Sequence, residues 1–400
     1  MTNQNQSVHT SDRLPSTAYL LTGCVAIVGS NSLVLGPIAP EVARSLGSST
    51  SVVMAATAMF GLGTAVSALL FARHIDRLGA WRVLKIAMVV LAAALLSSAL
   101  APYVGLLIAA QVLAGVATGV ALPAIYSSAA AIAPPGRESR TIGVVLTGWT
   151  LSLVVGVSFS AVLADFVHWR AVYAAVAILA VAAFVILLRY KHPRAIATES
   201  APMPTEALKI PGVAPLLIAC GAFMSAFYGI YGFLGDHLHN HLGRPLSANG
   251  LAALAYGFGF GSAALLDKHI DRLGAQRTMP IAFLAVCFVF ICMALVGDSF
   301  GGLLATVFVW GLANHIALNV LIMRLTAIAP SQRGTIMGLN SAVTYLAVFM
   351  GTTGFGVVYA NFGFIASAIL AAALTLVSAL SGMWRGAKPL PLSSRTPNNE

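Results

Sequence analysis

Ionisable side chains are scarce in the apolar stretches of this chain, and His315 is placed where it could move a proton. The charge-free stretch 299–323 centres on Gly311, so His315 lies about 6 Å from its middle if the stretch is a helix. A histidine changes charge near neutral pH and can also bind a ligand. The structural alternative is a neutral histidine that donates one hydrogen bond to a neighbouring helix.

Further polar groups occur at helical spacing around His315 and at a corresponding place earlier in the chain. Asn314 and Asn319 share its stretch, and an internal repeat, described below, aligns Thr118 with Asn314. The helical face around Thr118 carries Gln111, Gly115, Thr118 and Gly119. We expect the two faces to line one central site, with a wall of small residues opposite a polar wall.

Other buried polar side chains could orient a mostly apolar ligand through a few hydrogen bonds. These candidates are Asn31, Tyr228, Tyr231, Asn340 and Tyr345. For Asn340 and Tyr345, helix packing without ligand contact is the alternative.

The segment DHLHNH, residues 236–241, combines a carboxylate with His237, His239 and His241. Asp236 is a second candidate for proton coupling, and it aligns with Glu41 of the first repeat as a paired position at an external gate. His237 and His241 could share a helical face and bind a metal ion with Asp236. Because Gly243-Arg244-Pro245 follows, we expect a solvent-exposed loop without a metal ion.

The elements that must hold these residues are membrane-spanning helices. Charged residues are 8% of the 400, against about 25% in soluble domains. Eight charge-free windows suit one span of roughly 20 residues each: 14–40, 45–72, 141–164, 171–188, 210–235, 245–266, 278–297 and 299–323. Two longer windows, 86–136 and 334–384, break at Pro102-Tyr103 and Asn361-Phe362-Gly363. The sequence therefore predicts an all-α membrane protein with twelve spans.

The distribution of basic residues predicts the orientation. With both termini inside, 19 of the 22 Lys and Arg residues fall in cytoplasmic segments, leaving Arg44, Arg170 and Arg244 outside. This placement accounts for the net charge of +10 without a nucleic-acid partner. We expect a multi-pass protein of the cell (inner) membrane.

Two halves of the chain repeat each other. HIDRLGAWR at 74–82 returns as HIDRLGAQR at 269–277, and LLTGC at 20–24 is answered by LLIAC at 216–220. An even number of spans separates the copies, so the repeats are parallel. The predicted parts are a cytoplasmic tail (1–17), a six-helix bundle (18–189), a cytoplasmic linker (190–211), a second six-helix bundle (212–384) and a tail (385–400).

The repeated loop resembles the signature of the major facilitator superfamily. The fourth span, with Gln111, Gly115 and Gly119, and the fifth, from Gly148 through Gly156 to Ser160, resemble its proton-linked drug and sugar efflux branch. The resemblance implies two pseudo-symmetric bundles that alternate access to a central site. It also implies a conformational latch on the cytoplasmic side, formed by Asp76, Arg77, Gly79, Arg82, Asp271 and Arg272.

These features favour a secondary transporter that exports a small organic molecule in exchange for protons. Since no carboxylate lies deep within a span, we expect a neutral or anionic substrate. A uniporter or importer shares the same features, and a membrane-embedded enzyme or a sensor is a more distant alternative. We expect no enzyme activity, no cofactor and no metal. The expected partners are the substrate, membrane lipid and, where transport is coupled, protons, and the expected state is a monomer.

Overall fold

The computed structural model describes residues 15–134, 137–190, 204–266, 272–329 and 332–383. Within these ranges the backbone alone is described at 72–77, 138–139, 204–205 and 264. The predicted latch residues Asp76 and Arg77 have side chains outside this description, and Asp271 lies outside it entirely.

The first half of the chain forms long helices joined by short turns. They are α1 (Ser16–Ser45), α2 (Thr50–Leu78), α3 (Ala80–Ala99), α4 (Val104–Ile132), α5 (Glu138–Leu151), η1 (Ser152–Val157), α6 (Ser158–Phe166) and α7 (Trp169–Arg189). The π-helical η1 joins α5 to α6, and together they make one apolar span from Arg140 to Phe166.

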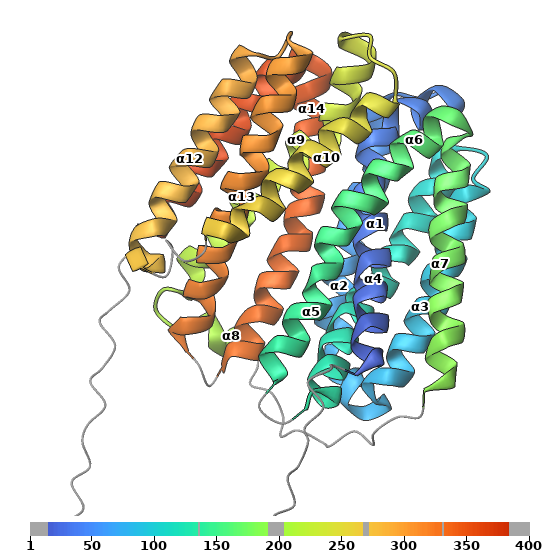
Figure 1. Cartoon of the computed structure of the whole chain (residues 1–400), viewed down its shortest axis with the longest axis vertical. Helices are drawn as coiled ribbons and strands as arrows, with labels where there is room; N and C mark the ends of the chain where they lie inside the picture. The colour runs from blue at the N-terminus through green and yellow to red at the C-terminus, as the bar shows by residue number, and fades with distance from the viewer. Residues whose placement is uncertain (1–14, 135–136, 191–203, 267–271, 330–331, 384–400) are drawn as a thin grey trace, which may run out of the picture.

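The second half repeats this plan. Its elements are α8 (Pro204–Ala207), α9 (Val213–Asp236), η2 (His237–His241), α10 (Ser247–Ser262), η3 (Ala263–Leu266), α12 (Ala275–Leu295), α13 (Phe300–Ile328) and α14 (Arg333–Gly382). Figure 1 shows the two halves side by side, with α1–α7 in blue to green and α9–α14 in yellow to red.

Long apolar helices make up the described structure because a backbone in lipid must satisfy its own hydrogen bonds. In the described part of the chain, ten helices are long and apolar enough to cross a membrane. One of them, α14, has non-helical geometry at Gly363, where φ is 76°, so the predicted break there is confirmed. The predicted break near Pro102 is also confirmed, between α3 and α4. The count of twelve spans stays a prediction.

Close packing of α2 on α4 depends on glycines in the first half. A Cβ on Gly115 of α4 would collide with the carbonyl oxygen of Phe60 on α2. A Cβ on Gly63 of α2 would lie 2.8 Å from the carbonyl oxygen of Val112. The missing side chains therefore let the two backbones approach each other.

The same two contacts recur in the second half, 196 positions later. Gly311 of α13 packs on the carbonyl oxygen of Tyr256, and Gly259 of α10 packs on that of Phe308. The internal repeat of the sequence is therefore also a repeat of helix packing at the level of single backbone atoms.

Candidate functional site

In the first half, Asn31 of α1 and Gln111 of α4 bind each other. Each side-chain amide donates to the other's oxygen, at 3.2 Å and 3.3 Å, and Gln111 also donates to the Ser98 hydroxyl at 3.1 Å. Both amides are almost fully buried. The structure thus joins two predicted ligand-binding residues, and their bonds connect α1, α3 and α4 within one half.

The predicted wall of small residues is wrong at Gly115 and Gly119. Gly115 packs on Phe60, as described above, and a Cβ on Gly119 would collide with the Ser67 hydroxyl and the carbonyl oxygen of Thr64. Both glycines therefore face α2, where the absence of a side chain lets α2 and α4 pack closely. Thr118 is fully buried beside them, and its hydroxyl has no hydrogen-bond partner within the described protein.

In the second half, Asn314 of α13 donates to the Tyr256 hydroxyl of α10 at 3.0 Å. The ring of Tyr256 contacts Trp310 at 4.9 Å and Phe227 at 5.6 Å between centroids. Phe227 also stacks on Tyr231 at 5.5 Å. An aromatic cluster of α9, α10 and α13 therefore surrounds the predicted polar wall.

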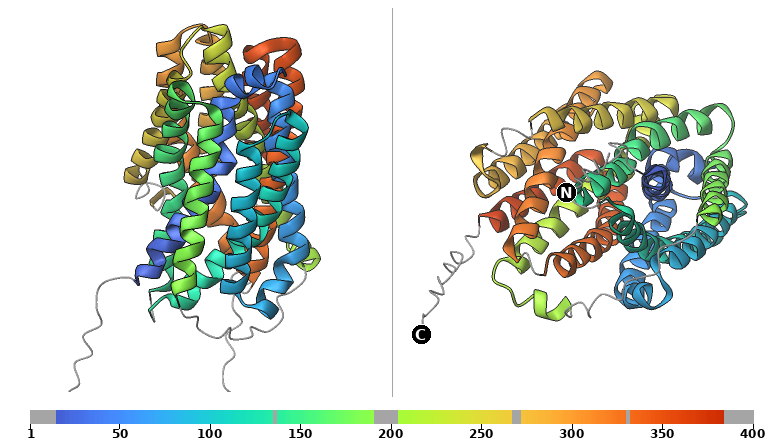
Figure 2. Two further views of the ribbon diagram at one scale, coloured as in Figure 1. Left: turned by 90° about the vertical axis from the view of Figure 1, so that its right-hand side faces the viewer. Right: turned by 60° about the horizontal axis from the view of Figure 1, so that its bottom comes forward.

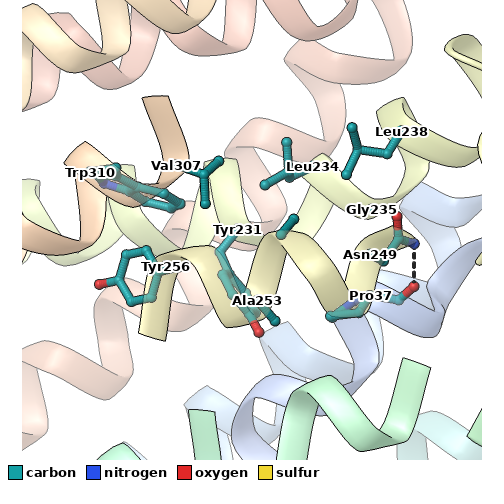
Figure 3. A pocket seen from close by; sticks show the side chains of 11 residues that line it. Pro37, Tyr231, Leu234, Gly235, Leu238, Asn249, Ala253, Tyr256, Val307 and Trp310 are labelled. Carbon is teal, nitrogen blue, oxygen red and sulfur yellow. Dashed lines mark hydrogen bonds between the residues drawn. The ribbon is translucent and has the colours of Figure 1, made fainter. Parts of the chain in front are cut away.

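A small cavity of about 10 Å³ lies beside this cluster (Figure 3), enough for about one water molecule. Tyr231, Tyr256 and Trp310 line it from the second half, and Pro37 reaches it from α1. Asn249 donates to the carbonyl oxygen of Pro37 at 2.7 Å, the dashed line in Figure 3. The site therefore lies where the two halves touch.

Several polar atoms around this junction are buried without a hydrogen-bond partner in the described protein. They are the hydroxyl of Tyr231, the indole nitrogen of Trp310 and the amide oxygens of Asn249 and Asn314. The amide oxygen of Asn340 on α14 is also buried without a partner in the described protein. A buried polar group without a partner is costly, so such groups are expected to bind water or a ligand.

Two predicted tyrosines of the second half contact residues of the first half. Tyr228 lies next to Ser32 of α1. Tyr345 of α14 packs edge-on against Phe60 of α2, with 6.3 Å between ring centroids. Within the first half, the Tyr126 hydroxyl of α4 accepts a hydrogen bond of 3.2 Å from the Trp149 indole. The predicted residues Tyr228 and Tyr345 are thus brought together with groups of the first half.

His315 and Asn319 lie on α13 and are half-buried. The His315 ring packs edge-on against Phe260 of α10, with 4.9 Å between centroids. Its counterpart in the first repeat is Gly119. The His315 imidazole therefore contacts α10 at the position where Gly119 contacts α2 in the first half. A role for His315 in proton movement stays a prediction.

Asp236 is the centre of a hydrogen-bond network at the end of the bundle opposite the linker, which the basic residues predict to be the outer end. Its carboxylate is buried and accepts bonds from the Thr50 hydroxyl, from Asn240 at 2.8 Å and from the Tyr359 hydroxyl at 2.7 Å. Thr50 belongs to the first half and the other residues to the second. We call Asp236, Thr50, Asn240 and Tyr359 the outer network.

Three further hydrogen bonds join the halves at this outer end. Besides the Asn249–Pro37 bond, the Ser51 hydroxyl donates to the carbonyl oxygen of Gly356 at 3.2 Å. The Ser247 backbone N–H donates to Asp165 at 3.1 Å. The outer end is therefore closed.

The expected exposed loop does not begin directly after Asp236, although His241 and residues 243–245 are exposed. The helix continues as the π-helical η2, and His237 is buried, with its Nε2 2.8 Å from the carbonyl oxygen of Gly297. His237 stacks on His241 at 4.8 Å and on Phe364 at 4.3 Å. In the described part of the chain, no three His, Cys, Asp or Glu side chains converge as a metal site would require.

Glu41, the repeat counterpart of Asp236, does not join the outer network. Its carboxylate binds Arg44 on its own helix. Glu41 therefore does not pair with Asp236 as the alignment suggested, and a gate role for Asp236 stays a prediction.

The described residues of the predicted latch are Gly79, Arg82 and Arg272. Gly79 begins α3 with φ 83°, and Gly274 begins α12 with φ 80°, a conformation that favours glycine. The side chains of Arg82 and Arg272 are exposed. Whether these residues latch the halves stays a prediction.

Some residues of the junction escape sequence reasoning. Tyr126, Tyr256 and Asn249 look like ordinary helix residues, and Thr50 and Tyr359 lie 186 and 123 positions from Asp236. The internal repeat gives one sequence signal for Tyr256: this residue aligns with Phe60 and differs from it by a hydroxyl group.

Comparison with known proteins agrees with this architecture. The Major Facilitator Superfamily family matches residues 21–352. The MFS-type transporter YwfA of Bacillus subtilis (strain 168) is 27% identical over 384 residues, covering 94% of this chain and 93% of its own. A chloramphenicol resistance protein of Streptomyces lividans is 27% identical over 338 residues, covering 80% and 84%.

Solved structures share the fold. A bacterial homolog of the human lysosomal transporter Spinster, inward-facing and unoccupied, superposes with a TM-score of 0.74 at 15% identity, covering 92% of this chain and 95% of its own. The inward-open xylose transporter XylE of E. coli also gives a TM-score of 0.74 at 16% identity, covering 94% and 97%.

Proposed function

This chain belongs to the major facilitator superfamily, and from that membership we propose that it exports a small neutral or anionic organic molecule in exchange for protons. The observation that carries the proposal is the junction between the halves. Uncharged hydrogen-bonding groups without partners lie there beside an aromatic cluster, below an outer end that is closed.

The substrate class follows from the groups at this junction. Tyr231, Asn314 and Trp310 offer hydroxyl, amide and indole groups next to aromatic rings, and none of them carries a formal charge. Such a surface suits a largely apolar molecule that has a ring and a few polar atoms. Efflux of a neutral organic compound is also in keeping with the relative named for chloramphenicol resistance.

Proton coupling is assigned to Asp236 and His315. Asp236 as a carboxylate accepts three hydrogen bonds, including one from the opposite half. Protonation weakens a carboxylate as an acceptor, so it would loosen the closed outer end. His315, on the helix that carries Asn314, would pass the proton on the cytoplasmic side.

The test is proton movement in proteoliposomes that contain a pH-sensitive dye. Members of a panel of neutral and anionic aromatic compounds should each be added under an imposed pH gradient. A substrate should cause proton movement in the opposite direction, and Asp236→Asn should abolish it. Asp298→Asn, which removes an exposed carboxylate near the same end, is the matched control and should leave it unchanged.

The proposal is contradicted if a compound is transported with no proton movement in the native protein. It is also contradicted if Asp236→Asn and His315→Ala together retain full coupling. Transport restricted to cations would refute the proposed substrate class.

A further inference from the structure

A groove of about 580 Å³ runs between α3 and α7 on the side of the molecule that faces the reader in the left view of Figure 2. This volume lies within the range of about 300–1,000 Å³ that is typical of small-molecule sites. Its lining is wholly apolar: Val89, Ala92, Ala93, Leu96, Ala174, Ala177, Ile178, Val181 and Phe184.

The groove exists because small side chains occupy its floor. Ala92 of α3 and Ala177 of α7 are buried there, whereas Val89, Leu96 and Ile178 stand exposed along its rims. The two alanines leave a gap between helices that pack elsewhere along their length. In a membrane, hydrocarbon must fill such a gap, since an empty one forfeits its dispersion contacts.

Basic residues continue both walls of the groove at one end. Lys85 lies 11 residues before Leu96 on α3, and Arg189 lies 11 residues after Ile178 on α7. A separation of 11 residues is close to three full turns, so each basic residue shares a helical face with the lining residue. Because α3 and α7 are antiparallel, both charges lie at the same end of the groove.

The distances suit one lipid chain. From Lys85 to Leu96 the helix rises about 16 Å, roughly half of a 30 Å hydrocarbon core. An acyl chain anchored by its headgroup at Lys85 and Arg189 would therefore lie along the groove to its far end. Arg82, one turn before Lys85, adds a third positive charge at the headgroup level.

We propose that the groove between α3 and α7 binds a phospholipid with an anionic headgroup, its acyl chain on the alanine floor and its phosphate at Lys85 and Arg189. Two basic residues at the mouth of an apolar groove complement this ligand, since basic residues near a membrane surface attract anionic lipid. This site is separate from the junction between the halves and does not depend on the proposed function.

Native mass spectrometry of the purified protein, titrated with phosphatidylglycerol or phosphatidylcholine of equal chain length, tests the proposal. The native protein should retain phosphatidylglycerol at least about fivefold more strongly. Lys85→Gln with Arg189→Gln should remove that preference. The control, Arg272→Gln with Arg277→Gln, removes two charges from exposed sites of the second half and should keep it.

A second variant tests the chain-binding floor. Ala93→Phe fills the groove without touching the basic residues and should weaken retention of both lipids, while the variant still unfolds at a temperature near that of the native protein. Unchanged phosphatidylglycerol retention in both the charge variant and Ala93→Phe would overturn the proposal. So would efficient cross-linking of two copies through Ile178→Cys in liposomes, which would mean that a second chain covers the groove.

Discussion

At the outer end, hydrogen bonds made by individual side chains join the two halves. Asp236 is buried and has hydroxyl and amide donors around it, one of which, Thr50, comes from the opposite half. A hydrogen bond to a charged group contributes about 1.5–3 kcal/mol. A bond that exists in the closed state alone biases the molecule toward closure by that amount.

Thr50→Val should therefore shift the equilibrium toward an open outer end by about ten- to hundredfold. The shift can be measured as the rate at which a polar thiol reagent, added from outside, modifies Ser32→Cys at the junction. Thr50→Ser keeps the hydroxyl and is the control, expected to react at the native rate. Equal rates in the Val and Ser variants would exclude Thr50 from the gate.

His315 is the second residue whose role can be separated from packing. His315→Ala should abolish or uncouple transport while membrane insertion stays intact, because the variant lacks the imidazole of α13. Substrate flux and proton movement, measured in the same proteoliposomes, distinguish the two outcomes. Full pH-dependent transport in this variant would leave the imidazole as a packing group against Phe260.

At the level of helices, glycine sets how closely neighbours approach. Gly311 of α13 packs against the backbone of Tyr256, and Gly115 of α4 makes the matching contact with Phe60. The Gly311 contact brings α13 against α10, where Asn314 donates to the Tyr256 hydroxyl at 3.0 Å. The helix spacing is thus a condition for the polar part of the junction.

Gly311→Ala should destabilise the protein by about 1–3 kcal/mol, because its methyl group would force α10 and α13 apart. The midpoint of thermal unfolding in detergent measures this effect. Gly301→Ala, on the same helix, meets nothing within 4 Å and should be neutral or slightly stabilising. If both variants unfold at the same temperature, the packing of α10 on α13 does not depend on the Gly311 contact.

For the whole molecule, the closed outer end is one state of the proposed alternating cycle. Contacts at Ser51–Gly356, Asn249–Pro37 and Ser247–Asp165 lie on different helix pairs around this end. They would all have to separate together when the halves rock apart.

A disulfide across this end should stop the cycle. A Cβ on Gly356 would lie 3.8 Å from the Cβ of Ser51, the usual spacing in a disulfide. Oxidised Ser51→Cys/Gly356→Cys should lose transport almost completely and recover it on reduction. Each single variant serves as a control; full transport by the cross-linked protein would mean that the outer end need not open.

Sequence alone determined the helical membrane architecture, the internal repeat and most of the polar residues at the junction. Charge-free stretches and helical spacing are local properties, so they can be counted along the chain. The pairing of Asn31 with Gln111, the role of Gly115 as a spacer and the burial of His237 were decided by tertiary structure. Each of these depends on which distant helix packs against the residue. Thr50 and Asp236, for example, are 186 positions apart, and a hydrogen bond between such distant residues leaves no periodic pattern in the sequence.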